Sequence, residues 1–118
     1  MAWLGLALTL PESDGRDLTI DVACASGNPV VAVWIESRSG GSDYADPGDP
    51  GRTAIKRFTF RQKFSDVYQV RVGCGGSRAQ WGITVLSSYD EPPYRRLDCD
   101  DVEVTGTRGA GCFDRPPR

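Results

Sequence analysis

Four cysteines carry the clearest chemistry in this sequence: Cys24, Cys74, Cys99 and Cys112. None lies in a C-x-x-C spacing, and the chain has no histidine to complete the usual set of zinc ligands. An even number of dispersed cysteines is typical of disulfides, which persist in oxidising compartments. Of the three possible pairings we predict Cys24 with Cys74 and Cys99 with Cys112, and we expect a secreted or cell-surface location. Buried free thiols in a cytosolic protein are the alternative.

The absence of histidine also narrows the possible reactions. It removes the Ser-His-Asp and Cys-His nucleophilic arrangements and the usual imidazole metal sites. A hydrolase with paired carboxylates stays formally possible, because the chain has 16 aspartate and glutamate residues. These acidic residues fall in predicted turns or at polar strand positions, where solvation explains them. We therefore expect no enzymatic activity and no cofactor.

Three acidic residues recur at every third position of a predicted surface loop, residues 37–52: Asp43, Asp46 and Asp49. Oxygen ligands gathered on one loop could hold Ca²⁺ with help from backbone carbonyls. The loop lacks the D-x-D-x-D-G pattern, and its Asp-Pro and Asp-Gly pairs are ordinary turn sequences. The sequence favours turn formation, with a calcium site as the alternative.

Basic residues alternate along the predicted strand at residues 53–64, where Arg57, Arg61 and Lys63 share one face. Arg71 joins them if the following strand pairs antiparallel with this one. Such a stripe could meet an anionic polymer or an acidic partner surface. Solvent-facing strands normally carry charges, which also block edge-to-edge aggregation, so a solvated face is the favoured interpretation.

Three tyrosines lie in predicted loops and are the candidates for exposed ligand contacts: Tyr44, Tyr89 and Tyr94. Binding residues are often carried by loops at the ends of a rigid scaffold. Trp34 and Trp81 fall on apolar strand faces, so we expect them in the core.

Period-two alternation runs through the chain and predicts about seven strands and no helix. The predicted strands are residues 1–10, 18–24, 30–36, 53–64, 66–74, 80–86 and 102–105. Residues 66–86 look like a β-hairpin. So many one-sided strands predict a two-layer antiparallel β-sandwich of the jelly-roll or immunoglobulin-like type. For residues 1–10, a remnant of a secretory signal is the alternative to a strand.

Length and charge limit the remaining possibilities. A chain of 118 residues fits one domain. We assign residues 1–88 to its sandwich core and residues 89–118 to a C-terminal appendage held by its own disulfide. The net charge of −2 argues against nucleic-acid binding, and no apolar run is long enough for a membrane-spanning helix.

Two family resemblances arise from these segments. Cys24, Trp34 and Cys74 resemble the Cys…Trp…Cys spacing of immunoglobulin domains, although Tyr68 lies six residues before Cys74 rather than two. Residues 17–87 resemble the bacterial pre-peptidase C-terminal type of β-sandwich. The similar stretches are LTIDVACASGNPVVAVWIESRSGG and FTFRQKFSDVYQVRVGCGGSRAQWGITVLSS.

The second of these stretches has the late hairpin of that family: a tyrosine entering a V-x-V strand, a glycine-rich turn, and an aromatic-x-I-x-V strand. The chain departs from the family where Asp66-Val67 replaces the usual glycine, and its cysteines are additional. The resemblance implies a non-catalytic accessory or substrate-binding role on a secreted enzyme.

Taken together, these patterns predict a secreted or cell-surface binding module that recognises a protein or a polysaccharide through loops. One alternative is a small secreted inhibitor or effector protein. Another is a structural accessory domain of a larger exported protein.

Overall fold

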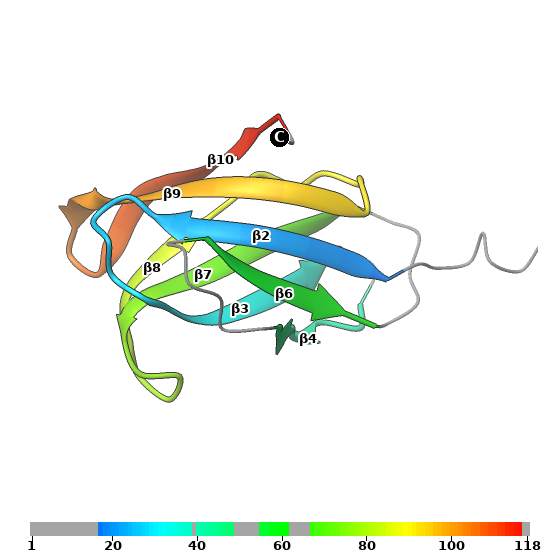
Figure 1. The fold of residues 1–118 in the computed structure, drawn as a ribbon, viewed down its shortest axis with the longest axis horizontal. Coiled ribbons are helices and arrows are strands. Elements are labelled where there is room, and N and C mark those ends of the chain that lie inside the picture. The colour runs from blue at the N-terminus through cyan, green and yellow to red at the C-terminus, as the bar shows by residue number, and fades with distance from the viewer. Residues whose placement is uncertain (1–16, 39, 49–54, 62–66, 117–118) are drawn as a thin grey trace, which may run out of the picture.

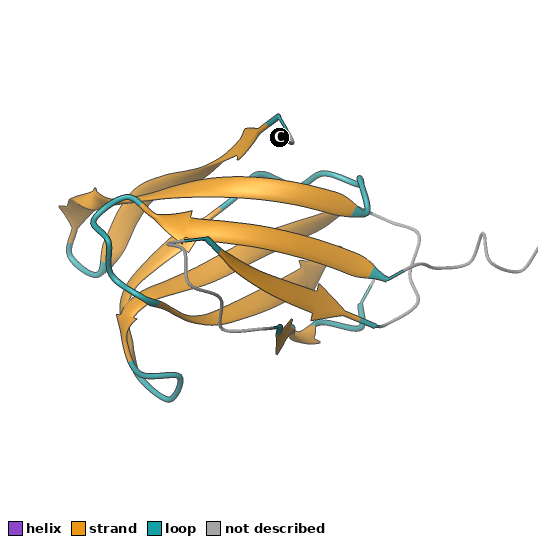
Figure 2. Ribbon diagram, viewed as in Figure 1, coloured by secondary structure: helices purple, strands orange, loops and turns teal. Residues whose placement is uncertain are grey.

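The computed structural model describes residues 17–38, 40–48, 55–61 and 67–116, and over these residues the chain is all-β (Figure 1 and Figure 2). The described residues contain no helix that could cross a membrane. The strands are β2 (Leu18–Cys24), β3 (Val30–Ser37), β4 (Asp43–Tyr44), β5 (Asp46–Pro47), β6 (Lys56–Phe60), β7 (Tyr68–Gly76), β8 (Trp81–Leu86), β9 (Tyr94–Thr105) and β10 (Arg108–Arg115). The predicted strand at residues 1–10 lies outside the described residues.

The strands form one sheet that curls into a nearly closed barrel. Its nine strands follow the order β4-β3-β7-β8-β10-β9-β2-β6-β5. The two outermost strands, β4 and β5, are separated along the chain by the single residue Ala45. The backbone N–H of Ala45 donates to the carbonyl of Val33 at 2.8 Å. We expected about seven strands in two separate layers, and the structure instead joins nine strands into one continuous sheet.

Pairing within the sheet is mixed. The predicted hairpin is confirmed, because β7 pairs antiparallel with β8. However, β2 pairs parallel with β9, and β10 pairs parallel with β8. The expectation of a purely antiparallel sheet is therefore wrong. The reason is that the β9–β10 hairpin is inserted between β8 and β2, which fixes its direction relative to both neighbours.

This insertion also changes the role of the C-terminal segment. Residues 89–118 were expected to form an appendage, yet β9 and β10 lie in the middle of the sheet (Figure 1). Leu97 and Cys99 of β9 are fully buried. The C-terminal hairpin is therefore part of the barrel and supplies part of its core.

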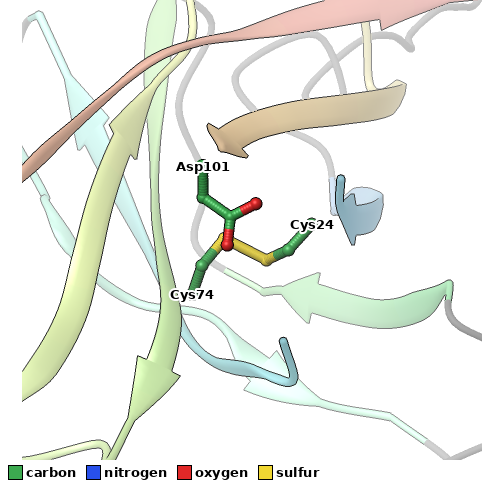
Figure 3. Close-up of side chains that lie close together, drawn as sticks. All are labelled: Cys24, Cys74 and Asp101. Atoms are coloured by element: carbon green, nitrogen blue, oxygen red, sulfur yellow. A yellow bond between two sulfur atoms is a disulfide. The ribbon is translucent and has the colours of Figure 1, made fainter. Parts of the chain in front are cut away.

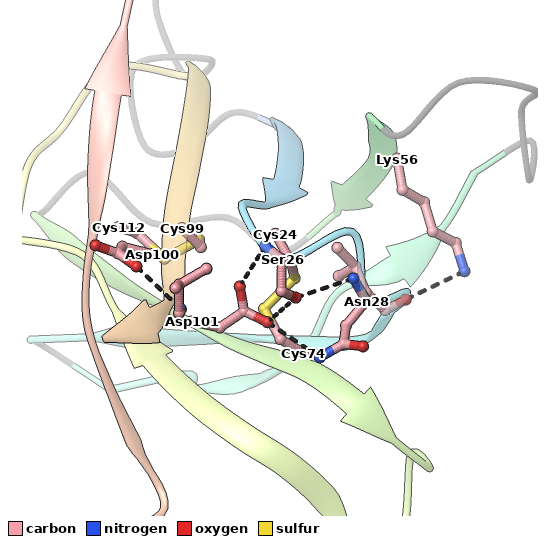
Figure 4. Close-up of a disulfide and its surroundings, with 11 residues drawn as sticks. Cys24, Ser26, Asn28, Lys56, Cys74, Cys99, Asp100, Asp101 and Cys112 are labelled. Atoms are coloured by element: carbon pink, nitrogen blue, oxygen red, sulfur yellow. Dashed lines mark hydrogen bonds between the residues drawn. A yellow bond between two sulfur atoms is a disulfide. The ribbon is translucent and has the colours of Figure 1, made fainter. Parts of the chain in front are cut away.

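The interior holds alternate side chains from the longer strands. The core includes Leu18, Ile20, Val22, Val33, Ile35, Phe58, Phe60, Tyr68, Val70, Val72, Val85 and Leu97. Both predicted disulfide pairings are confirmed. Cys24–Cys74 connects β2 with β7, and Cys99–Cys112 connects directly paired residues of β9 and β10 (Figure 4). The disulfides thus tie the inserted hairpin together and link the two sides of the barrel.

A buried arginine connects β9, β10 and β7. Arg95 is 2% exposed and donates two hydrogen bonds to the Asp114 carboxylate, each 2.8 Å long. It donates a third to the backbone carbonyl of Tyr68 at 3.3 Å. Its guanidinium carbon also lies 5.4 Å from the centroid of the Tyr68 ring. Arg95 therefore joins three strands from inside the barrel.

Candidate functional site

Three aromatic side chains gather on the outside of the barrel, over β3, β4 and β8. The Trp34 and Tyr44 rings meet edge to face with centroids 5.0 Å apart, and Tyr44 and Trp81 lie 6.4 Å apart. The guanidinium of Arg78 covers the Tyr44 ring at 4.7 Å from its centroid. We call these four residues the aromatic surface. Tyr44, the first candidate for ligand contact, lies at its centre.

The strand register brings Trp34 and Tyr44 together. Trp34 lies on β3 between Val33 and Ile35, both fully buried, so its own side chain projects from the opposite face. Tyr44 on β4 is its paired residue across the strands. The Trp34 indole N–H donates to the Glu36 carboxylate at 2.7 Å, which orients the ring. The prediction that Trp34 belongs to the core is therefore wrong.

Trp81 reaches the same surface because β7 carries a glycine beneath it. A Cβ atom built on Gly73 would lie 2.6 Å from Cδ2 of Trp81, so the indole ring packs directly on the backbone there. The Trp81 indole N–H donates to the Arg78 carbonyl at 3.1 Å. Trp81 is only half-buried, which corrects the expectation that it is a core residue.

Charged side chains border the aromatic surface on the β3–β7 side. Arg71 of β7 lies 3.9 Å from the Glu36 carboxylate and donates to the Gln69 side chain at 3.2 Å. Arg71 and Glu36 are both partly exposed. Tryptophan, tyrosine and arginine are the residue types most enriched at the energetic centres of protein interfaces. The aromatic surface thus combines all three types inside a polar border.

The other two candidate tyrosines lie elsewhere. Tyr89 is 39% exposed and lies under the Arg38 guanidinium at 5.0 Å. Tyr94 is half-buried, and its hydroxyl donates to the Asp21 carboxylate at 2.8 Å. This hydrogen bond raises the pKa of Tyr94 above its usual value. The structure therefore does not bring the three candidate tyrosines into one site.

The predicted basic stripe is divided between two sides of the barrel. Arg71 lies on β7, which pairs with β3 and β8 and not with β6, so the condition for its joining Arg57 and Arg61 is not met. Arg57 binds both oxygens of Asp21, at 2.8 and 2.9 Å. Arg61 lies 3.3 Å from the Asp17 carboxylate. Lys63 lies outside the described residues.

The predicted acidic cluster is described only in part. Asp43 and Asp46 are exposed in β4 and β5, and Asp49 lies outside the described residues. The Asp43 carboxylate accepts a hydrogen bond from the backbone N–H of Tyr44 at 2.7 Å. Asp43 thus has a local structural role next to the aromatic surface, and its use as a calcium ligand stays a prediction.

The carboxylate of Asp101 lies beside the Cys24–Cys74 disulfide (Figure 3). Two cysteine sulfurs and one Asp101 oxygen come within 4.8 Å of one another, but sulfurs in a disulfide are not thiolate ligands. Asp101 accepts hydrogen bonds from Ser26 and Asn28 (Figure 4). Burial acts to raise the pKa of Asp101, but these hydrogen bonds outweigh it and the pKa is lowered. The cluster fastens the β2–β3 turn to β9.

Comparison with models of protein families, with curated proteins and with solved structures gives no match to this chain. Sequence reasoning identified Tyr44 from its loop position but missed its neighbours Trp34, Trp81 and Arg78. Alternation puts Trp34 on the opposite strand face from its two sequence neighbours, but both faces of residues 30–36 are apolar, so the sequence carries no signal that the Trp34 face is the outer one.

Proposed function

We propose that this chain is a non-catalytic binding module that acts in an oxidising, extracellular setting and recognises a protein through the aromatic surface. The observation that carries this proposal is the packing of Trp34, Tyr44 and Trp81 on the outside of the barrel. Exposed groups of large aromatic rings mark interaction sites, because burial of their apolar surface is favourable in free energy and folding alone normally achieves it. The two disulfides support the oxidising setting.

The arrangement of the rings favours a protein over a polysaccharide. Sugars stack on flat, open ring faces, whereas these rings are inclined to one another by 87° and 68°. In addition, Arg78 covers one face of Tyr44. The result is an uneven surface with ring edges and a guanidinium, which suits the side chains of a protein.

The aromatic surface is also held in place before any ligand arrives. The indole N–H groups of Trp34 and Trp81 each have an acceptor within the chain, and Gly73 fixes how closely Trp81 approaches the sheet. Side chains that are already ordered lose less conformational entropy on binding. The rings therefore form a rigid contact area rather than a set of mobile side chains.

The test is selection of binding peptides from a phage-displayed random library on the immobilised domain. Peptides that also bind the Tyr44→Ala variant are removed. Binding of the selected synthetic peptides is then followed through tryptophan fluorescence. A Tyr89→Ala variant is the matched control, because Tyr89 has a similar exposed fraction (39% against 36%) and also lies beneath an arginine.

We expect selected peptides to lose at least about tenfold in affinity with Tyr44→Ala or Trp81→Ala, and to bind Tyr89→Ala like the parent. Both tyrosine variants should keep a melting temperature close to that of the parent. Selection of no peptide sensitive to Tyr44 would contradict the proposal. Depletion of the domain by insoluble cell-wall glycans, abolished by Trp81→Ala, would instead support a polysaccharide ligand.

A further inference from the structure

Four charged residues lie in one row across the side of the barrel formed by β6, β2, β9 and β10. Asp21 of β2 is paired with Arg57 of β6 on one side and with Arg96 of β9 on the other. Arg96 is in turn paired with Arg115 of β10. We call these four residues the arginine row. Three guanidinium groups thus share the row with one carboxylate.

The arginine row points outward. Its neighbours along β9, Arg95 and Leu97, are buried, whereas Arg96 is half-buried. The strands β6, β2 and β9 lie on one side of the barrel and β3 and β7 on the other (Figure 1). The row is therefore separate from the aromatic surface, and an inference from it does not depend on the proposed protein-binding function.

The carboxylates near the row already have partners other than Arg96. One Asp21 oxygen binds Arg57, and the other binds both Arg57 and Tyr94. The Asp98 carboxylate accepts a hydrogen bond from Arg115 at 2.6 Å. Arg96 makes no ion pair within 4.0 Å among the described residues. Among the described residues, Asp21 therefore acts on the Arg96 charge only through a coulombic interaction without an ion-pair contact.

Arg96 is also incompletely hydrogen-bonded. Its Nε atom is buried and has no hydrogen-bond partner among the described residues. A buried donor without an acceptor is destabilising, and so are like charges placed directly opposite one another in a sheet. Arg96 and Arg115 form such a like-charged pair. An anion placed between them relieves both defects.

We infer that Arg96 and Arg115 form a binding site for an oxyanion, a sulfate-like or carboxylate group. A guanidinium presents two parallel N–H donors that match two oxygens of such a group. Because the Arg96 Nε atom is buried, this binding requires the Arg96 side chain to turn outward, so that Nε and a terminal nitrogen reach the same anion. Arg115 contributes the second positive charge from the neighbouring strand. The oxyanion belongs to a free ion or to an acidic group on a larger molecule.

The experiment follows the arginine Nε–Hε signals by nitrogen–proton NMR while sodium sulfate is added to the intact domain. A parallel titration with sodium chloride at the same ionic strength removes the effect of general screening. Sodium acetate serves as the carboxylate probe. We expect the Arg96 signal to move saturably with sulfate or acetate and to stay in place with chloride. The better of the two probes identifies the source to look for.

Two variants with the same change in charge locate the site. Arg115→Gln should weaken the apparent affinity measured at Arg96 about tenfold or more. Arg61→Gln should leave it unchanged, because Arg61 lies outside the row and pairs with the exposed Asp17. Near-ultraviolet circular dichroism verifies that both variants keep the parent fold. Equal signal movements in chloride, or equal losses in the two variants, would overturn the inference.

Discussion

Replacement of Asp114 by alanine tests how much the ion pair between Asp114 and the buried Arg95 contributes to the stability of the fold. The Arg95 side chain is 1% exposed and the Asp114 side chain 42% exposed. The variant removes a partly hydrated carboxylate and leaves a buried guanidinium behind. Breaking a buried ion pair from one side typically destabilises a protein by about 3–5 kcal/mol, since the remaining charge is uncompensated.

The structure brings the expected effect down to the lower limit of that range or just below it. Arg95 loses two of its three hydrogen bonds and keeps the one to the Tyr68 carbonyl. Each unmatched buried donor costs about 1–3 kcal/mol. Because Asp114 is partly exposed, water can occupy its place and satisfy part of this loss. We therefore expect the free energy of unfolding to fall by about 2–3 kcal/mol.

Urea unfolding followed by tryptophan fluorescence measures this loss, with Asp98→Ala as the matched control. Asp98 has a similar exposed fraction (37%), but its partner Arg115 is 60% exposed. Exposed pairs contribute little, so Asp98→Ala should lower stability by less than about 1 kcal/mol. Equal losses in the two variants would refute the reasoning that burial of Arg95 makes the difference.

Three further changes have expected outcomes. The hydrogen bond from Arg57 lowers the pKa of Asp21. The Asp21 carboxylate therefore stabilises the fold above about pH 4, and this stabilisation is lost as the pH falls further. In urea unfolding, Asp21→Asn should lower the free energy of unfolding more at pH 7 than at pH 2. Gly73→Ala should displace the Trp81 ring, where a Cβ would approach to 2.6 Å, and change near-ultraviolet circular dichroism. The double variant Cys99→Ala/Cys112→Ala opens a loop with a sequence separation of 13 and should lower the unfolding free energy by about 3 kcal/mol in calorimetry.

Regular alternation predicted the parts of the fold where one strand face is apolar and the other polar. Residues 18–24 and the hairpin predicted at residues 66–86 are of this kind, and the structure has β2 at Leu18–Cys24 and the β7–β8 hairpin over Tyr68–Gly76 and Trp81–Leu86. The cysteine number predicted two disulfides with three possible pairings, and the structure has the pairing that we chose among them. The alternating strands are local features, so a single sequence is enough to predict them, whereas the disulfide pairing was a choice among few alternatives.

The C-terminal hairpin was harder to predict because its buried face is partly charged. Four positions of β9 are buried: Arg95, Leu97, Cys99 and Asp101. Two of the four are ionisable, so the segment lacks the alternating apolar residues of a buried strand. For this reason it was interpreted as an appendage. Its burial depends on partners distant in the sequence, such as Ser26, which binds Asp101 across 75 residues. No local pattern contains that information.

The aromatic surface was missed for the opposite reason. Residues 30–36 are apolar on both strand faces, and the sequence does not say which face turns inward. The decision comes from strand pairing, which sets Tyr44 opposite Trp34 on the outside. Pairing with a strand of only two residues leaves almost no trace in the sequence.

These two departures from simple patterning have different explanations, and the difference bears on the proposed function. The polar residues inside are satisfied within the chain: Arg95 by Asp114 and Asp101 by Ser26. The fold alone accounts for them. The aromatic residues outside are oriented by hydrogen bonds, yet Tyr44 keeps 36% of its surface exposed at the centre of the group. Tyr89 is similarly exposed, so the feature that sets Tyr44 apart is its packing with two tryptophan rings, and the proposed binding partner accounts for that group.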